Sequence, residues 1–365
     1  MDGYSIYLPC YTIGKDVYEK VGKVCLDYGD TAVIITGHKS FDAAGEKLLA
    51  ACKASGITIT GSVYYGGECS YSNLEKLQEN PAVQEATLLF ALGGGKVTDT
   101  TKALGEIVNK AVFSFPTITS NCSGCTSVSI MYNDDGSFLK PYFITRPPLH
   151  TFLDLDVIAG APSRYMWAGM GDTYAKYFEA NMSSRGEELS HYVGLGVTIS
   201  QMCLDPILRY GRKALADNKK GIASAELENV VLAINVTTAL TSILVTKDKI
   251  IDYNTGLAHA INYGLTSYPD VETQHLHGEI VSFGVLILLL IEEKMDESMK
   301  GMFDKLYSFS KDTKLPVKLQ DLGLTDADKD TVIDKALAMK DIDHNPYVIT
   351  REMLVEAFDQ LQAME

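Results

Sequence analysis

Strand-like and helix-like segments alternate along the first third of the sequence, and this alternation constrains the fold more than any other feature. The strand-like runs lie at residues 31–36, 57–67, 87–95 and 111–117, and helix-like stretches separate them at residues 41–56, 73–86 and 96–110. Strands that are separated by helices pair in parallel, and the helices cover both faces of the resulting sheet. We therefore predict a doubly wound α/β domain for the N-terminal part of the chain.

The rest of the chain has a different pattern. Residues 126–144 form two alternating runs around the turn signal NDDG, which predicts an antiparallel hairpin. Beyond about Ser163 the strand-like runs almost vanish, and long helical stretches such as residues 224–245 replace them. We predict an α/β domain at residues 1–160 and an all-helical domain at residues 161–365.

The composition excludes several classes of function. The chain has 365 residues, of which 46% are apolar and 22% are charged, as is typical of a soluble globular protein. A formal net charge of −15 disfavours a nucleic-acid-binding face, because phosphate backbones require positive potential. The longest apolar run, residues 280–291, is shorter than the roughly 20 residues that span a bilayer. No export signal opens the sequence and its seven cysteines are scattered, so we expect a cytoplasmic protein with reduced thiols and no membrane association.

A glycine run at residues 93–95 ends a buried strand and is followed at once by a helix. Glycines let the backbone approach an anion, and the first N–H groups of the helix point at it, so a pyrophosphate can dock there. Gly94, Gly95 and Lys96 are the candidate contacts, and Asp99 lies in the first turn, where it caps the helix or holds the loop. The spacing matches neither standard phosphate-binding fingerprint, so a tight turn without a ligand is an equally good interpretation.

The next strand-like run leads into a second polar loop, FPTITSNCSGCTS. The carboxyl ends of adjacent parallel strands share one crevice, so Thr117, Thr119 and Ser120 are expected to face the same nucleotide as the glycine run. Cys122 and Cys125 form a CxxC pair, but this loop leads into a hairpin, and a second cysteine pair that would complete a zinc site is missing. We interpret them as reduced thiols, one of which lines the substrate pocket.

Three segments of the helical part carry metal-binding residue types. Asp172 follows the sequence Gly-Met-Gly, His259 lies among small apolar residues, and the stretch HLHGEI contains His275, His277 and Glu279. One carboxylate and two histidines on separate helices make an open three-ligand site that water or substrate completes. The spacing is no named motif, and an N-cap aspartate with hydrogen-bonded core histidines is the alternative interpretation.

Taken together, these segments resemble the iron-containing alcohol dehydrogenase superfamily, and within it the glycerol dehydrogenase-like group. The matching stretches occur in family order through most of the chain, and they are YYGGECS (64–70), GGGKVTDTTKA (93–103), FPTITS (115–120), SVSIMYNDDG (127–136), GAPSRYMWAGMGDTYAKYFEA (160–180), GLAHAINYGLT (256–266) and HGEIVSFGVL (277–286). The resemblance implies an N-terminal dinucleotide-binding α/β domain, a C-terminal all-helical metal-binding domain, and an active site in the cleft between them.

The resemblance also implies roles for individual residues. The family's metal-ligand positions, which we also take as the catalytic ones, correspond to Asp172, His259 and His277, whereas His275 is not assigned as a ligand. The positions of the pyrophosphate loop correspond to Gly94, Gly95, Lys96, Thr98 and Asp99, and the segments around the nicotinamide half contain Thr117, Thr119, Ser120, Thr126, Val128 and Tyr132. The expected cofactors are therefore NAD(P)(H) and one divalent metal ion, Zn²⁺ or Fe²⁺.

Two departures from the family pattern bear on the substrate and on the cofactor. Glycerol dehydrogenases carry an aspartate that contacts the polyol where this chain has Cys122, and Asn121 replaces the preceding threonine. The loss of negative charge favours an anionic substrate, and a branch of the group that reduces 2-oxo acids is similar here. After the second strand, His38 and Lys39 stand where NAD-using relatives often place an acid, which favours NADP(H), because a cation tolerates a 2′-phosphate.

We expect a metal-dependent oxidoreductase that interconverts a small alcohol and its carbonyl, with a 2-hydroxy acid and 2-oxo acid pair favoured and glycerol dehydrogenase as the alternative. A dehydroquinate synthase-like lyase is a weaker candidate, because few basic residues lie near the predicted ligands. A non-catalytic nucleotide-binding protein is the candidate from another class. The expected partners are a small-molecule substrate and further copies of the chain in a homo-oligomer.

Overall fold

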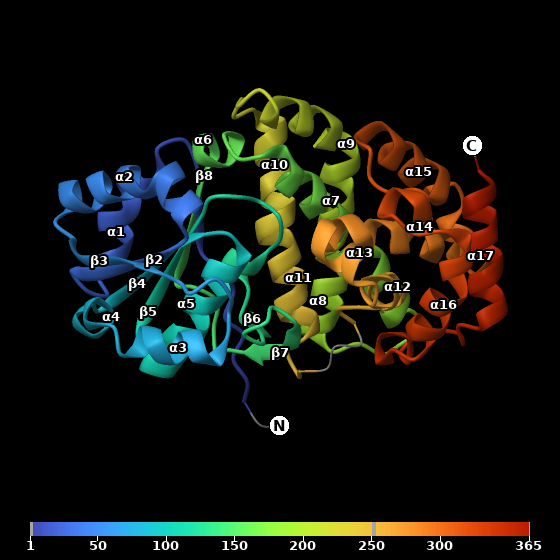
Figure 1. Cartoon of the computed structure of the whole chain (residues 1–365), viewed down its shortest axis with the longest axis horizontal. Coiled ribbons are helices and arrows are strands. Elements are labelled where there is room, and N and C mark those ends of the chain that lie inside the picture. The colour runs from blue at the N-terminus through green and yellow to red at the C-terminus, as the bar shows by residue number, and fades with distance from the viewer. Residues whose placement is uncertain (1–2, 250–252, 365) are drawn as a thin grey trace. The chain divides into compact units, whose positions relative to one another are not determined.

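The computed structural model describes residues 3–249 and 253–364 (Figure 1). It divides into two compact units, of which the first contains Met1–Pro162 and Ala216–Ile243 and the second contains Ser163–Leu215 and Leu244–Glu365. This grouping differs from two contiguous domains, because Ala216–Ile243 groups with the first unit. The functions assigned to residues 1–160 and 161–365 stay predictions.

A six-stranded parallel sheet forms the centre of the first unit. Its strands are β1 (Tyr11–Gly14), β2 (Thr31–Thr36), β3 (Thr58–Tyr64), β4 (Leu88–Gly93), β5 (Ala111–Pro116) and β8 (His150–Asp154). They lie in the spatial order β1, β8, β5, β4, β2, β3, and every neighbouring pair is parallel. The predicted doubly wound α/β architecture is confirmed, and the short edge strand β1 is an addition to the predicted elements.

Helices cover both faces of this sheet. They are the 3-10 helix η1 (Val17–Lys20) with α1 (Val21–Cys25), α2 (His38–Ser55), α3 (Tyr71–Gln78), α4 (Pro81–Glu85) and α5 (Gly95–Val108). Successive side chains of a strand point to opposite faces, so Ala32 and Ile34 belong to the apolar core shared with η1, α1 and α2. Val33 and Ile35 belong to the core shared with α3, α4 and α5. Figure 1 shows the two groups of helices on opposite sides of the strands.

The polar loop after β5 leads into the predicted antiparallel hairpin. The elements here are the 3-10 helix η2 (Ser123–Cys125), β6 (Val128–Tyr132), β7 (Phe138–Phe143) and, after β8, helix α6 (Leu155–Ala159). Strands β6 and β7 pair with each other in antiparallel register, as the NDDG turn predicts. The hairpin therefore begins directly after the loop that carries Thr117, Thr119, Ser120 and Thr126, and its first strand carries Val128 and Tyr132.

A continuous helical rod forms the later part of the first unit. It consists of α10 (Ala225–Leu232), the π-helical turn η3 (Ala233–Thr237) and α11 (Thr238–Val245). By length and composition, Ala225–Val245 is apolar enough to cross a membrane, but 67% of that window is buried inside the structure. The core helices of soluble proteins have the same properties.

Helices alone form the second unit, as far as its described residues extend. They are α7 (Ser163–Ser184), α8 (His191–Ile199), α9 (Gln201–Asn218, whose last turn belongs to the first unit), α12 (Leu257–Thr266), α13 (Pro269–Gln274), α14 (His277–Met295), η4 (Glu297–Met299), α15 (Met302–Thr313), η5 (Leu319–Leu322), η6 (Asp326–Asp328), α16 (Lys329–Leu337), η7 (Lys340–Ile342) and α17 (Arg351–Ala363). Helix α14 packs against both α7 and α12. Its residues 280–291 are buried throughout, as expected for the apolar run that follows HLHGEI.

Candidate active site

Two glycines bring helices α7 and α14 into direct backbone contact. A Cβ atom added to Gly278 would lie 2.1 Å from the carbonyl oxygen of Ala168, and one added to Gly171 would lie 2.2 Å from the carbonyl oxygen of Gly278. No side chain fits at either position, so the two helices approach this closely only because both residues are glycine. Their sequence neighbours Asp172 and His277 are thereby placed close together.

Helix α12 brings His259 to the same place by a similar contact. A Cβ atom added to Gly284 of α14 would lie 2.5 Å from the carbonyl oxygen of Ala258, the residue before His259. The histidine is 5% exposed, and its ring centroid lies 5.4 Å from that of His277. Three helices thus contribute one predicted ligand each to a single position in the second unit.

The donor atoms of these three residues converge. His259 Nε2 and His277 Nε2 each lie 3.8 Å from Asp172 Oδ1, and one ligand atom from each residue lies within 4.8 Å of the other two. Ligands at about 2.0–2.2 Å from a common ion are at most about 4.4 Å apart, so a small side-chain adjustment closes the set around one Zn²⁺ or Fe²⁺. The His277 side chain is 53% exposed, which leaves the site open to water or substrate. The donor set therefore fits one divalent ion, and the ligand roles stay predictions.

Glu179 of α7 holds His259 in position, although no sequence motif indicates it. Its Oε2 lies 2.6 Å from His259 Nδ1, and its Oε1 accepts hydrogen bonds of 2.9 Å from the backbone N–H groups of Gly256 and His259. The glutamate side chain is fully buried. Because Nδ1 donates to this carboxylate, the lone pair of His259 lies on Nε2, the atom nearest Asp172. The one sequence signal is spacing, because Glu179 follows Asp172 by about two helical turns and shares its face of α7.

The same carboxylate sets the electrostatics of His259. Burial lowers the pKa of His259, but the charge and the hydrogen bond of Glu179 outweigh this effect and leave the pKa above its usual value. A protonated imidazole cannot bind a metal ion, so protons compete with metal at this residue. Glu179 thus fixes the orientation of the ring and also strengthens its basicity.

His275 and Glu279, the other polar residues of HLHGEI, form the start of α14. His275 Nδ1 lies 2.7 Å from Glu279 Oε1, and Glu279 Oε2 accepts a 3.1 Å hydrogen bond from the backbone N–H of Leu276. The carboxylate therefore satisfies a helix-terminal donor while it orients the neighbouring imidazole. These contacts give His275 a structural role beside the predicted ligand His277.

In the first unit, the glycine loop packs so closely against the polar loop after β5 that a side chain larger than hydrogen would not fit at Gly94 or Gly95. A Cβ atom added to Gly94 would lie 2.6 Å from Ile118 Cδ1, and one added to Gly95 would lie 2.8 Å from Asn121 Nδ2. Helix α5 begins here, and its first N–H groups lack intrahelical acceptors. A small cavity lies between the loops, and its wall includes the predicted residues Gly94, Gly95, Thr98, Ser120 and Asn121 together with the unpredicted Asn235. This backbone-lined space at a helix start fits phosphate oxygens.

Thr117 and Thr119 do not line this cavity but tie its walls together. The backbone N–H of Thr117 donates to the carbonyl oxygen of Gly93 at 3.2 Å, which joins the two loops. The side chain of Thr119 accepts a 2.7 Å hydrogen bond from Asn235 Nδ2. Both threonines are buried, and these hydrogen bonds hold the two loops in place.

Asp99, Thr126 and Val128 belong to a buried polar network rather than to the cavity wall. The fully buried Lys102 Nζ lies 2.9 Å from Asp99 Oδ1, and it donates to Thr126 Oγ1 at 3.1 Å and to the carbonyl oxygen of Val128. Asp99 Oδ2 accepts from the backbone N–H of Ile130 at 3.2 Å. Burial raises the pKa of Asp99, and Lys102 opposes that shift. The network ties α5, and with it the glycine loop, to β6.

Lys96, the predicted phosphate partner, is engaged by two neighbours. Its Nζ lies 2.5 Å from Glu68 Oε1 and 5.2 Å from the ring centroid of Tyr132. At the carboxyl ends of β2 and β3, the ring of His38 stacks on Tyr64 at 4.7 Å between centroids, and the adjacent Lys39 is exposed. The predicted nucleotide residues thus follow β2, β4 and β5, except Thr126, Val128 and Tyr132, which lie at or in β6.

The two predicted substrate residues follow Ser120 in the polar loop. Asn121 Oδ1 accepts a 3.1 Å hydrogen bond from the backbone N–H of Ser123, and the side chain lines the cavity. Cys122 is partly buried, and none of the seven cysteines forms a disulfide. The structure therefore places no carboxylate at these two positions.

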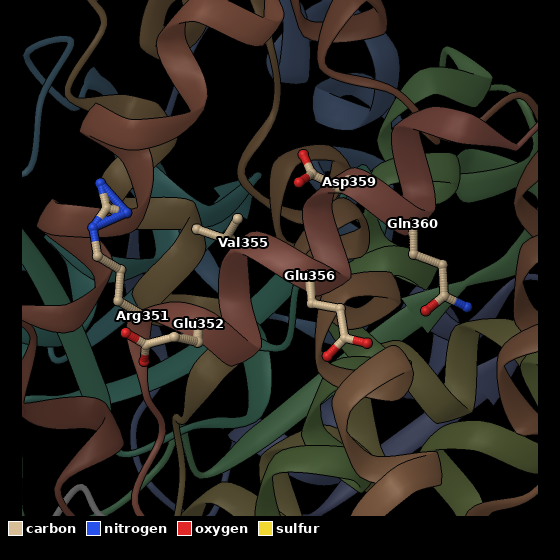
Figure 2. A pocket seen from close by; sticks show the side chains of 6 residues that line it. All are labelled: Arg351, Glu352, Val355, Glu356, Asp359 and Gln360. Atoms are coloured by element: carbon tan, nitrogen blue, oxygen red, sulfur yellow. The ribbon is translucent and has the colours of Figure 1, made fainter.

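A wider surface hollow lies elsewhere, along α17. Figure 2 shows its lining residues, which are Arg351, Glu352, Val355, Glu356, Asp359 and Gln360. All six come from one helix, and none belongs to the predicted sites. The hollow therefore adds nothing to the candidate active site.

Comparisons with known proteins bear on the fold and the family. The family model for iron-containing alcohol dehydrogenase matches residues 9–150. Glycerol dehydrogenase from Thermotoga maritima is 31% identical over 296 residues, which cover 77% of this chain and 75% of that protein. Hydroxycarboxylate dehydrogenase A from Escherichia coli is 28% identical over 342 residues, with 92% and 90% covered. The crystal structure of glycerol dehydrogenase from Schizosaccharomyces pombe superposes with a TM-score of 0.85 at 25% identity, and the match covers 100% of this chain and 91% of that one.

Proposed function

The chain belongs to the iron-containing alcohol dehydrogenase family, and we propose that it interconverts a 2-hydroxy acid and its 2-oxo acid with NADP(H) and one bound Zn²⁺ or Fe²⁺. At the coarser level it is a metal-dependent oxidoreductase of the glycerol dehydrogenase type that acts on small alcohols. The observation that carries the proposal is the convergence of Asp172, His259 and His277 within 4.8 Å. The similarity to named dehydrogenases argues against the lyase and the non-catalytic protein that the sequence left open.

The residues of the second unit would bind the metal and orient the substrate. A divalent ion held by Asp172, His259 and His277 would polarise the substrate oxygen. Glu179 accepts the Nδ1 proton of neutral His259 and so aims the Nε2 lone pair at the site, which is the orientation that a ligand requires. The backbone contact between Gly171 and Gly278 keeps Asp172 and His277 together.

The residues of the first unit would bind the dinucleotide. A nicotinamide cofactor would accept or supply the hydride, so the protein needs only to bind and orient it. A pyrophosphate needs space close to the backbone and free N–H groups. Gly94 and Gly95 leave that space, and the start of α5 supplies the N–H groups. Lys39, exposed beside His38, is the basis for proposing a 2′-phosphate and hence NADP(H).

The preference for an anionic substrate rests on Asn121 and Cys122. The first lines the cavity and the second is partly buried, and neither carries a negative charge that would repel a carboxylate. Glycerol is the second candidate substrate, because relatives named glycerol dehydrogenase match this chain at least as well as the hydroxycarboxylate dehydrogenase. We also propose that the protein is cytoplasmic and that it forms a homo-oligomer. Sedimentation of the purified protein would test the oligomeric state.

A substrate screen with metal analysis tests the proposed function. The metal-free protein would be reloaded with Zn²⁺ or Fe²⁺ and assayed with glycerol, other polyols and a series of 2-oxo acids, each with NADH and NADPH. We expect turnover only after reloading, with the highest kcat/KM for a 2-oxo acid and NADPH. A highest kcat/KM for glycerol would replace the proposed substrate, and full activity of an Asp172→Ala/His277→Ala double variant would refute the metal site.

A further inference from the structure

Asn235 reaches the dinucleotide cavity from a distant part of the chain. It lies more than 100 residues after the glycine loop and the polar loop, yet it lines the cavity that they enclose. The residue is buried, with an exposed fraction of 1%. A buried amide in the wall of a small cavity beside the glycine loop is a candidate for direct contact with a cofactor that enters there.

The helix that carries Asn235 departs from regular geometry at this residue. Residues Ala233–Thr237 form a π-helical turn between two α-helices, and the N–H and the hydroxyl of Thr238 both donate to the carbonyl oxygen of Ala233. Such turns are rare, weaken the helix locally, and concentrate at functional sites. The irregular turn is therefore an observation independent of the cavity that points to the same residue.

The hydrogen bonds of the Asn235 side chain use Nδ2 but not Oδ1. The two protons on Nδ2 are taken by Thr119 Oγ1 at 2.7 Å and by the carbonyl oxygen of Val231 at 3.1 Å. These two bonds fix the orientation of the amide. Within the described part of the chain, the Oδ1 atom has no hydrogen-bond donor, so it is an oriented acceptor on a side chain of the cavity wall.

We propose that Asn235 Oδ1 accepts a hydrogen bond from the nicotinamide half of the bound dinucleotide. That half carries ribose hydroxyls and a carboxamide, which are the donors such an acceptor recognises. The pyrophosphate is accounted for by Gly94, Gly95 and the start of α5, whose free N–H groups can donate to it. The inference rests on the proposed function. It adds a residue that would contact only the nicotinamide half of the dinucleotide.

The test compares a whole dinucleotide with its adenosine half. Binding of NADH, NADPH and ADP to the purified full-length protein would be titrated for the wild type and for Asn235→Ala. Loss of one hydrogen bond predicts about three- to tenfold weaker binding of the dinucleotide. ADP lacks the nicotinamide riboside, so its affinity should not change. A purely structural role for Asn235 would weaken both ligands together.

Two further variants make the result decisive. Asn229→Ala is the matched control, because Asn229 lies six residues earlier in the same rod, is partly buried, does not line the cavity, and donates from its side chain only to Ala225 within the described residues. Thr119→Val removes the partner that orients the amide, and it is expected to give a smaller loss that is again selective for the dinucleotide, whether or not Asn235→Ala folds.

The failures are distinguishable. Dinucleotide binding to the wild type with unchanged affinity in Asn235→Ala and Thr119→Val overturns the inference and leaves the proposed function intact. Equal losses for the dinucleotide and for ADP also overturn it. If the wild type binds neither dinucleotide, the proposed function itself fails.

Discussion

Glu179 Oε2 lies 2.6 Å from His259 Nδ1, and the same carboxylate binds two backbone N–H groups at the start of α12 through Oε1. One buried side chain thus fixes both the helix that carries a predicted metal ligand and the ring orientation of that ligand. The carboxylate lies on α7, the helix that also carries Asp172. The proposed metal site therefore depends on a residue that would not itself touch the metal.

Replacing Glu179 should weaken metal binding without removing a ligand. In Glu179→Gln the imidazole loses its charged partner, and we expect about 10- to 100-fold lower affinity for Zn²⁺, the usual effect of losing such a support. Titration of the metal-free protein with Zn²⁺ measures this. Glu188→Gln, an exposed change in the loop that follows α7, is the control and should bind as the wild type does. Equal affinity in both variants would contradict the role of Glu179.

Metal affinity should depend on pH through His259. Its pKa lies above the ordinary value of about 6.5, and the neutral ring is the form that binds metal. Below that pKa, affinity should fall about tenfold for each pH unit, and above it the dependence through this residue should level off. In the metal-free protein the sign is the reverse. The stability that the raised pKa contributes is present at low pH and is lost as pH rises through that pKa.

The variant Glu179→Gln separates this effect from other titrations. Without the carboxylate, burial and the charge of Lys176 lower the pKa of His259 and only Asp172 opposes them, so the break in the pH profile should move to lower pH. Metal dissociation constants across about pH 5 to 9 for both proteins show it. A break at the same pH in both would mean that another group controls the profile.

The contact between α7 and α14 should not tolerate a methyl group. In Gly278→Ala the new Cβ would meet the carbonyl oxygen of Ala168 at 2.1 Å, so the helices must separate. We expect a loss of about 1–3 kcal/mol in the free energy of unfolding and weaker metal binding, because Asp172 and His277 move apart. In the control Gly194→Ala of helix α8, the nearest atom is 3.9 Å away, and stability should stay level or rise. Urea unfolding of both variants checks the prediction, which fails if their midpoints coincide.

The buried pair of Asp99 and Lys102 should be costly to break on one side only. Lys102→Met leaves the Asp99 carboxylate buried without its cation, and we expect a loss of about 3–5 kcal/mol in the free energy of unfolding. The double variant Asp99→Leu/Lys102→Met removes both charges and should recover much of that loss. Denaturant unfolding measures all three proteins. A double variant less stable than Lys102→Met would show that the hydrogen bonds to Thr126 and Ile130 matter more than the charge pair.

Much of the fold is readable from local patterns. Thr31–Thr36 is a strand in the structure and in the prediction, because a β-branched run bounded by glycine has few alternatives. The NDDG turn predicted the hairpin of β6 and β7 for a similarly local reason. The grouping of Ala216–Ile243 with the first unit was not readable, because an apolar helical stretch does not indicate which core it joins.

The candidate sites divide in the same way. By itself, the sequence determined the alternation of strands and helices and the glycine loop at the start of α5, because these are matters of residue identity and local spacing. It also predicted Asp172, His259 and His277 as metal ligands, from their residue types and from the family resemblance. Only the tertiary structure decided that Glu179 supports His259, that Asp99 pairs with Lys102 in a buried network, and that Asn235 lines the cavity. The physical reason is that buried polar groups must find partners wherever the packing brings them, and packing joins residues that no sequence period relates.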